Sequence, residues 1–129
     1  MSVLANVSGG YPAVSFKNVG DSVAGRIIST EDYQEKIFDG PDKGKPRTYP
    51  KTGDPVMATK IVLETAPGDE SSRVTLYAQG GLLIKAIVRA FREAGASDVT
   101  VGDEMAVTFT GMDGRAKTYA AAYDVTPAS

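Results

Sequence analysis

The chain has 129 residues, with 14 Lys and Arg against 16 Asp and Glu, and it contains no His and no Cys. This length favours one domain with a single core. The missing residue types exclude disulfide scaffolds, thiol nucleophiles, imidazole acid–base catalysis and zinc sites built from Cys or His. The carboxylates show no spacing typical of a metal loop, so we expect no enzyme, no metal and no cofactor. The net charge of −2, taken alone, argues against a nucleic-acid partner.

The two ends of the chain are expected to lie outside the folded domain. Residues 1–15 are small and weakly patterned and read as a loose lead-in, 16–126 form the domain, and 127–129 are a short tail. The first residues lack the basic start and long apolar core of a signal peptide. No apolar run approaches the roughly 20 residues that span a bilayer. The expected location is therefore the cytoplasm.

Alternating apolar and polar residues predict five strands. These strands are expected at 21–30, 56–65, 73–78, 104–110 and 118–125. Gly25 suggests a bend or bulge in the first strand, which could continue through residues 33–38. In the third strand, Leu76 should face the core and Tyr77 the outside. Tyr119 and Tyr123 of the last strand should both pack into the core.

The apolar residues change to a helical period between the third and fourth strands. A helix is expected at 81–94, with Gly95 as its C-terminal cap. An all-β chain of five strands with one helix at this point has the connectivity of the OB-fold. This fold is a Greek-key barrel that binds oligonucleotides on strands two and three and with its 1–2 and 4–5 loops.

The segment 39–55 is rich in Pro and Gly and predicts a long 1–2 hairpin loop. Between Gly40 and Pro55 it has four cations and two acids, a local charge of +2 in a chain of net charge −2. A loop of this length in a small domain tends to be functional or disordered. The competing interpretation is a solvated surface loop whose lysines keep the protein soluble.

The order of several sequence runs resembles the small single-stranded DNA-binding proteins of bacteriophages that infect actinobacteria. The runs are SFKNVGDSVAGRI, MATKIVLET, RVTLYAQG and VTFTGMDGRAKTYAAAY, within residues 15–125. The resemblance implies an OB-fold that coats single-stranded DNA in phage replication or recombination, without catalysis, in the cytoplasm of the host cell. Replication or recombination proteins would be its protein partners.

Sequence-independent binding of a single strand needs cations for phosphates and aromatic faces for bases. The residues expected to do this are Tyr33, Lys36, Lys43, Lys45, Arg47, Tyr49, Lys51, Lys60, Arg73, Tyr77, Arg115 and Lys117. Three further cations on the helix, Lys85, Arg89 and Arg92, are expected to form a solvated face.

One small domain covers few nucleotides. We therefore expect a homo-oligomer, with a dimer favoured, or cooperative binding along the strand. The alternative function is a barrel that binds proteins or serves as a structural phage component, without binding nucleic acid.

Overall fold

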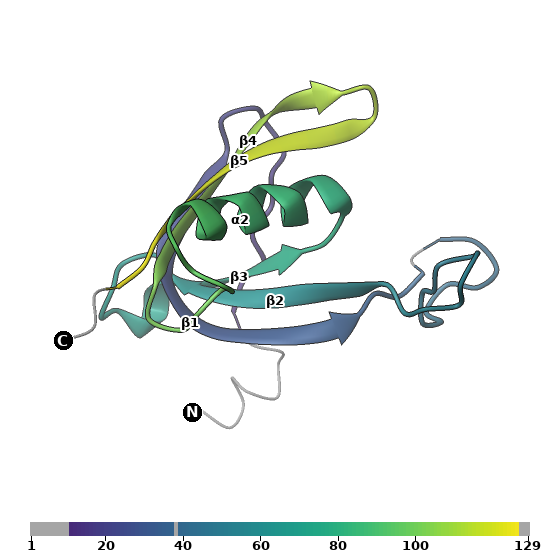
Figure 1. Ribbon diagram of the computed structural model, residues 1–129, viewed down its shortest axis with the longest axis horizontal. Helices are drawn as coiled ribbons and strands as arrows, with labels where there is room; N and C mark the ends of the chain where they lie inside the picture. Colours follow the sequence, from purple (N-terminus) through teal and green to yellow (C-terminus); the bar gives the residue numbers. More distant parts are fainter. Residues whose placement is uncertain (1–10, 38, 127–129) are drawn as a thin grey trace.

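The computed structural model describes residues 11–37 and 39–126. Its elements are β1 (Ser22–Gln34), β2 (Met57–Glu64), η1 (Glu70–Ser72), β3 (Arg73–Ala78), α2 (Gly81–Glu93), β4 (Glu104–Asp113) and β5 (Ala116–Asp124). Five antiparallel strands with a long helix between the third and the fourth confirm the predicted order of elements (Figure 1). The strands β4 and β5 are longer than predicted, and β1 continues past residue 30 but ends at Gln34, before the end of the predicted continuation at residue 38. Only Gly114 and Arg115 connect β4 to β5.

The strands form one sheet in the order β3-β2-β1-β4-β5. The long strand β1 pairs with β4 through its first part and with β2 through the rest, and the pairing register with β2 shifts between Ile27 and Ser29. Such a bulge increases the local twist of a strand and helps a sheet to curve. Among the described strands β3 and β5 do not pair, so the sheet is open.

The segment before β1 lies between the two edges of the sheet. Ala13 pairs in parallel with Thr75 of β3 through two backbone hydrogen bonds of 2.8 Å. Three residues later, Phe16 packs edge-to-face on Tyr119 of β5, with 5.4 Å between the ring centroids. Residues 11–15 therefore differ from the loose lead-in that their weak pattern predicts, because their partners are distant in sequence. Residues 1–10 and 127–129 lie outside the described part of the chain.

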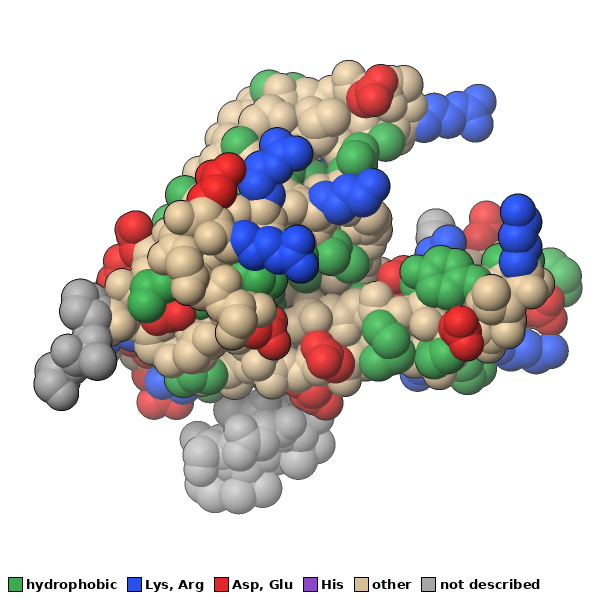
Figure 2. All heavy atoms as spheres, viewed as in Figure 1, with side chains coloured by type: hydrophobic (Ala, Val, Ile, Leu, Met, Phe, Trp, Pro, Cys, Tyr) green, Lys and Arg blue, Asp and Glu red, His purple; other side chains and the backbone are tan. Residues whose placement is uncertain are grey.

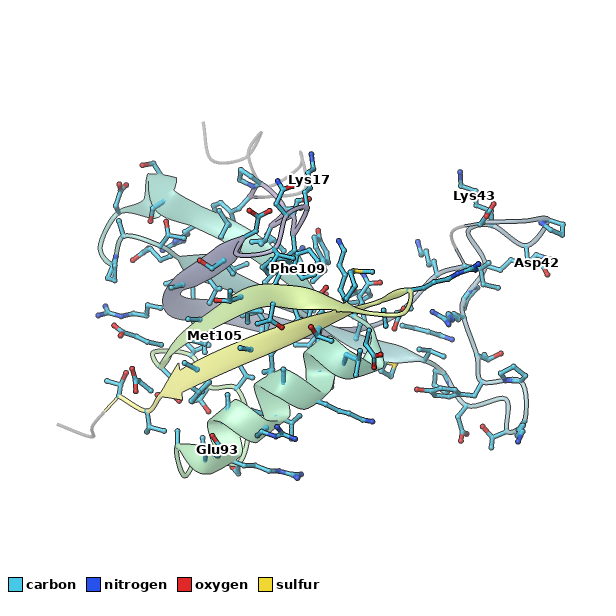
Figure 3. All side chains as sticks on the ribbon, turned by 90° about the horizontal axis from the view of Figure 1, so that it is seen from above. Lys17, Asp42, Lys43, Glu93, Met105 and Phe109 are labelled. Atoms are coloured by element: carbon cyan, nitrogen blue, oxygen red, sulfur yellow. The ribbon has the colours of Figure 1, made fainter. Side chains whose placement is uncertain are left out.

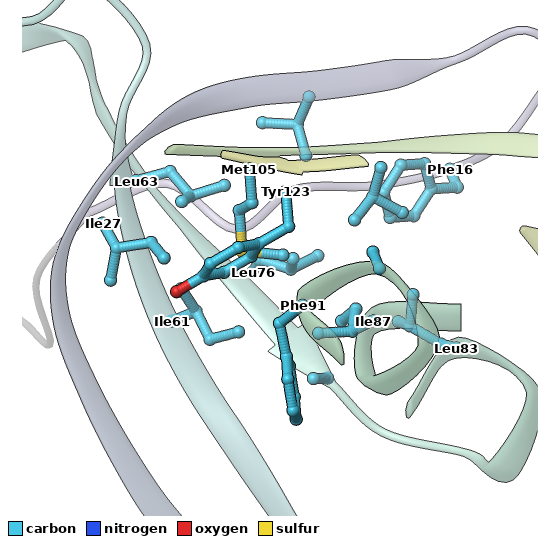
Figure 4. Close-up of a cluster of buried hydrophobic side chains, with 14 of the residues drawn as sticks. Phe16, Ile27, Ile61, Leu63, Leu76, Leu83, Ile87, Phe91, Met105 and Tyr123 are labelled. Carbon is cyan, nitrogen blue, oxygen red and sulfur yellow. The ribbon is translucent and has the colours of Figure 1, made fainter. Parts of the chain in front are cut away.

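The core lies between the concave face of the sheet and α2 (Figure 4). The helix stripe Leu83, Ile87 and Phe91 is buried against it, as the helical period predicts. The β3 side chains face as expected, since Leu76 is buried in the core and Tyr77 is exposed.

Gly25 is required by a close approach of two strands. The β1 bulge lies further along the strand, and the Cβ of any other residue at position 25 would sit 2.6 Å from the carbonyl oxygen of Glu64. We therefore expect Gly25→Ala to lower the free energy of unfolding by about 1–3 kcal/mol, as overpacked sites do. Urea unfolding measures this loss, with Ala24→Ser at the exposed neighbouring position as the control. Equal stability of the wild type and Gly25→Ala would contradict the close approach.

A buried polar cluster holds the end of β5. The Tyr123 hydroxyl donates a hydrogen bond to the Asp103 carboxylate at 2.6 Å and accepts one from the Thr100 N–H at 2.9 Å. The second Asp103 oxygen accepts the Thr126 N–H at 2.9 Å. Burial, assisted by the hydrogen bond to Asp103, raises the pKa of Tyr123 to about 12.

This raised pKa predicts an alkaline loss of stability. The folded state favours the neutral phenol, so its contribution is complete below pH 10 and is lost as the pH rises towards about 12. The free energy of unfolding of the wild type should fall by about 2 kcal/mol relative to Tyr123→Phe over this interval. Urea unfolding at a series of pH values measures the difference. Parallel pH profiles for the two proteins would refute the prediction.

Candidate nucleic-acid interface

The chain between β1 and β2, residues 35–37 and 39–56, forms a projection that we call the arm (Figure 1). Backbone hydrogen bonds organise it: the Arg47 N–H donates to the Glu35 carbonyl at 2.7 Å, and the Val56 N–H donates to the Arg47 carbonyl at 3.0 Å. At its second turn the Tyr49 N–H donates to the Asp54 carbonyl at 2.9 Å. The arm is therefore a pair of small hairpins with a defined backbone.

Two of the predicted arm cations are paired with carboxylates. Arg47 Nη1 lies 3.3 Å from Oε1 of Glu35, whose side chain is buried. Lys45 Nζ lies 3.1 Å from Oδ1 of Asp42, and both side chains are exposed. Figure 3 shows Asp42 and the neighbouring Lys43 on the projecting loop. An exposed pair of this kind contributes little free energy and exchanges readily for another anion. Arg47, in contrast, neutralises a carboxylate that would otherwise be buried without a partner, so it positions the base of the arm.

The remaining arm cations have no ion-pair partner among residues 11–37 and 39–126. They are Lys36, Lys43 and Lys51, and all three are exposed. Because no carboxylate competes for their ammonium groups, they are free to approach phosphates. The local +2 charge counted along the sequence is thus located on exposed side chains of one projection.

Two of the predicted aromatic side chains lie together on the convex face of the sheet. Tyr33 of β1 and Tyr77 of β3 pack edge-to-face, with 6.3 Å between ring centroids. Tyr77 is 39% exposed, whereas the Tyr33 hydroxyl is buried with no hydrogen-bond partner in the described part of the chain. Burial raises the pKa of Tyr33, and the nearby Gln79 side chain offsets part of this rise. The third tyrosine, Tyr49, is 53% exposed on the arm.

Lys60 and Arg73 share that convex face but differ in their surroundings. Lys60 lies in register between Glu31 of β1 and Tyr77 of β3, so the three residues are neighbours across the sheet. Arg73 contacts the buried carboxylate of Glu64 at 3.0 Å, and its guanidinium also contacts Glu70 and Tyr11. The structure therefore brings Lys60 to the tyrosines and holds Arg73 in an internal ion pair.

The β4–β5 hairpin is the second projection. Arg115, in its turn, is exposed. Lys117 instead donates a hydrogen bond to the Phe16 carbonyl, and its ammonium lies 5.2 Å from the centroid of the Phe109 ring. Lys117 thus anchors the segment before β1. A hollow of about 370 Å³ separates the hairpin from the β3–α2 turn.

The arm and the β4–β5 hairpin extend from the same side of the molecule (Figure 1). Figure 2 shows Lys and Arg side chains on both projections and a recess between them. Exposed apolar side chains that the sequence analysis did not single out also lie here: Leu82 lines the hollow and Met112 lies on the hairpin. The sequence feature that could have identified Met112 is its position beside the turn of the hairpin. In the structure it lies opposite Lys117 in the β4–β5 register.

Comparisons with protein-family models, with curated proteins and with solved structures find no match to this chain. Over the described ranges, none of the helices has the length and apolar character needed to span a membrane.

Proposed function

We propose that this chain binds single-stranded DNA without sequence preference. The observation that carries the proposal is the presence of two chemistries on one part of the molecule. These are arm lysines with no ion-pair partner within residues 11–37 and 39–126, and exposed tyrosines, Tyr49 on the arm and Tyr77 on β3. Phosphates need mobile cations, and unpaired bases need aromatic faces on which to stack. Figure 2 shows the Lys and Arg side chains of the arm and of the hairpin on either side of a recess.

The proposed fold is an OB-fold whose barrel is open between β3 and β5. The strand order β3-β2-β1-β4-β5 and the helix between β3 and β4 support it. Ligand in such folds lies on strands two and three and against the 1–2 and 4–5 loops. In this chain those regions are the Lys60 and Tyr77 surface, the arm, and the hairpin with Arg115.

In the proposed mechanism the predicted residues divide into two groups. Phosphates contact exposed cations and the half-buried Lys60, and bases stack on Tyr49 and Tyr77, with Tyr33 packed nearly perpendicular to the Tyr77 ring. The cations proposed to contact DNA are Lys36, Lys43, Lys45, Lys51, Lys60 and Arg115. Arg47, Arg73 and Lys117 are proposed instead to position the arm, β3 and the first segment, because their charges are engaged within the protein.

The proposed role is to coat single strands during phage replication or recombination in the host cytoplasm. One such domain contacts few nucleotides, so tight binding would come from several copies acting as an oligomer or cooperatively.

Fluorescence anisotropy with a labelled dT oligonucleotide, across a salt series and with a duplex of equal length as competitor, tests the proposal. We expect binding at low salt, a linear fall of log affinity with log salt, and weak competition by the duplex. A flat response to the oligonucleotide, or a preference for the duplex, would overturn it. The flat response is also what the alternative function, protein interaction or a structural phage role, predicts.

A further inference from the structure

The free edge of β5 faces a groove beside α2. Among the described strands β5 pairs only with β4, so every second residue on its other edge directs an N–H and a C=O away from the sheet. The groove has a volume of about 400 Å³. Residues 118–121 of β5 form one wall, and Leu82, Lys85, Arg89 and Glu93 of α2 form the other.

The helix and β5 run in the same direction along this groove. Leu82, at the start of α2, lines the same hollow as Lys117 and Tyr119. Near the other end, the Phe91 ring packs on Tyr123 with 6.1 Å between centroids. An extended segment lying in the groove would therefore contact the β5 edge and the exposed helix residues over their whole common length.

The helix wall of the groove is basic. Lys85 and Arg89 are exposed and have no ion-pair partner within the described ranges, and Arg92 lies beside them on the outer side of the helix. Figure 2 shows this group of Lys and Arg side chains over α2. Glu93 is the one acidic residue among those that line the groove.

We propose that this groove binds an extended acidic segment of another protein, which adds to β5 as a further strand. The backbone edge would supply main-chain hydrogen bonds, and alternate side chains of the segment would reach Lys85 and Arg89. Exposed Leu82, at the hairpin end of the groove, offers a contact for one apolar side chain.

Three other occupants fit the groove less well. A second copy joined through β5 would bring two α2 helices with the same basic residues together, which is unfavourable. Single-stranded DNA cannot complete a strand ladder, and Tyr119, the one aromatic side chain lining the groove, packs on Phe16 and Phe109. Residues 1–10 and 127–129 contain no Asp or Glu, so they lack the acidic side chains to pair with the helix.

The probe is a labelled, capped hexapeptide, Leu-Asp-Val-Glu-Val-Asp, in which acidic side chains alternate as a strand requires. We expect it to bind the full chain and to shift the amide NMR signals of residues 118–121. The double variant Lys85→Glu, Arg89→Glu should weaken binding at least about fivefold while leaving the thermal midpoint unchanged, because both side chains are exposed. Two further peptides carry N-methyl groups on alternate residues, one on the odd-numbered and one on the even-numbered positions. Only the set whose N–H groups face β5 should abolish binding when methylated.

The outcomes separate this inference from the proposed function. Peptide binding lost in the double variant, with binding to the dT oligonucleotide retained, supports the acidic-segment groove. Loss of oligonucleotide binding in the same variant, with no peptide binding by the wild type, would overturn it and assign the helix to the DNA path. A dimer that dissociates in the variant on analytical ultracentrifugation, without peptide binding, would overturn it in favour of a second copy.

Discussion

Replacing Lys43, Lys45 and Lys51 with glutamine is expected to lower the affinity for a dT oligonucleotide about 100-fold at roughly 100 mM salt. Lys43 and Lys51 are exposed without an ion-pair partner in the described chain, and Lys45 shares only an exposed pair with Asp42. Each lost phosphate contact removes about 0.7 from the slope of log affinity against log salt. The three contacts together should make that slope shallower by about 2.

The matched control removes the same three charges from α2. Lys85→Gln, Arg89→Gln, Arg92→Gln changes the net charge as much as the arm variant does, but at side chains away from the arm. We expect it to leave the affinity within about threefold and the salt slope unchanged, because counterions are released only where phosphates are contacted. Equal losses in the two triple variants would mean that net charge, and not the arm, governs binding. Anisotropy titrations at several salt concentrations measure both quantities.

The arm shows how far the sequence alone could lead. Its composition predicted a long basic hairpin, and its cations were correctly located on one projection. Which cations are free depends on partners across the fold. The pairing of Arg47 with Glu35 requires the backbone hydrogen bond that joins these two residues, and no local pattern encodes that register.

The dependence on contacts between residues distant in sequence also explains the other differences between the predicted and the observed structure. The alternation of apolar and polar residues in β3 was enough to predict that Leu76 faces the core and Tyr77 the outside, because successive side chains of a strand point to opposite faces of the sheet. The contact of Lys117 with the Phe16 carbonyl joins residues far apart in the chain. It depends on the path of a segment whose small residues show no periodicity. Long-range hydrogen bonds and the position of the β1 bulge, which lies after Gly25, therefore had to come from the three-dimensional structure.

Tyr77→Ala should weaken binding of the dT oligonucleotide about tenfold or more, and it should do so without altering the salt dependence. The ring is exposed on the convex face and packs nearly perpendicular to Tyr33, which restricts its orientation. A stacked base contributes about 1–3 kcal/mol and involves no release of counterions. Loss of the ring should therefore shift the whole salt profile downwards in parallel.

The conservative variant Tyr77→Phe separates stacking from other roles of this residue. It keeps the aromatic face and removes only the hydroxyl, so its affinity should stay within about twofold of the wild type. A fall equal to that of Tyr77→Ala would assign the effect to the hydroxyl and contradict stacking. Because the arm variant changes the slope and Tyr77→Ala changes the intercept, combining the two should give additive losses if phosphates and bases are contacted independently. Strong non-additivity would show instead that Tyr77 acts by positioning the arm.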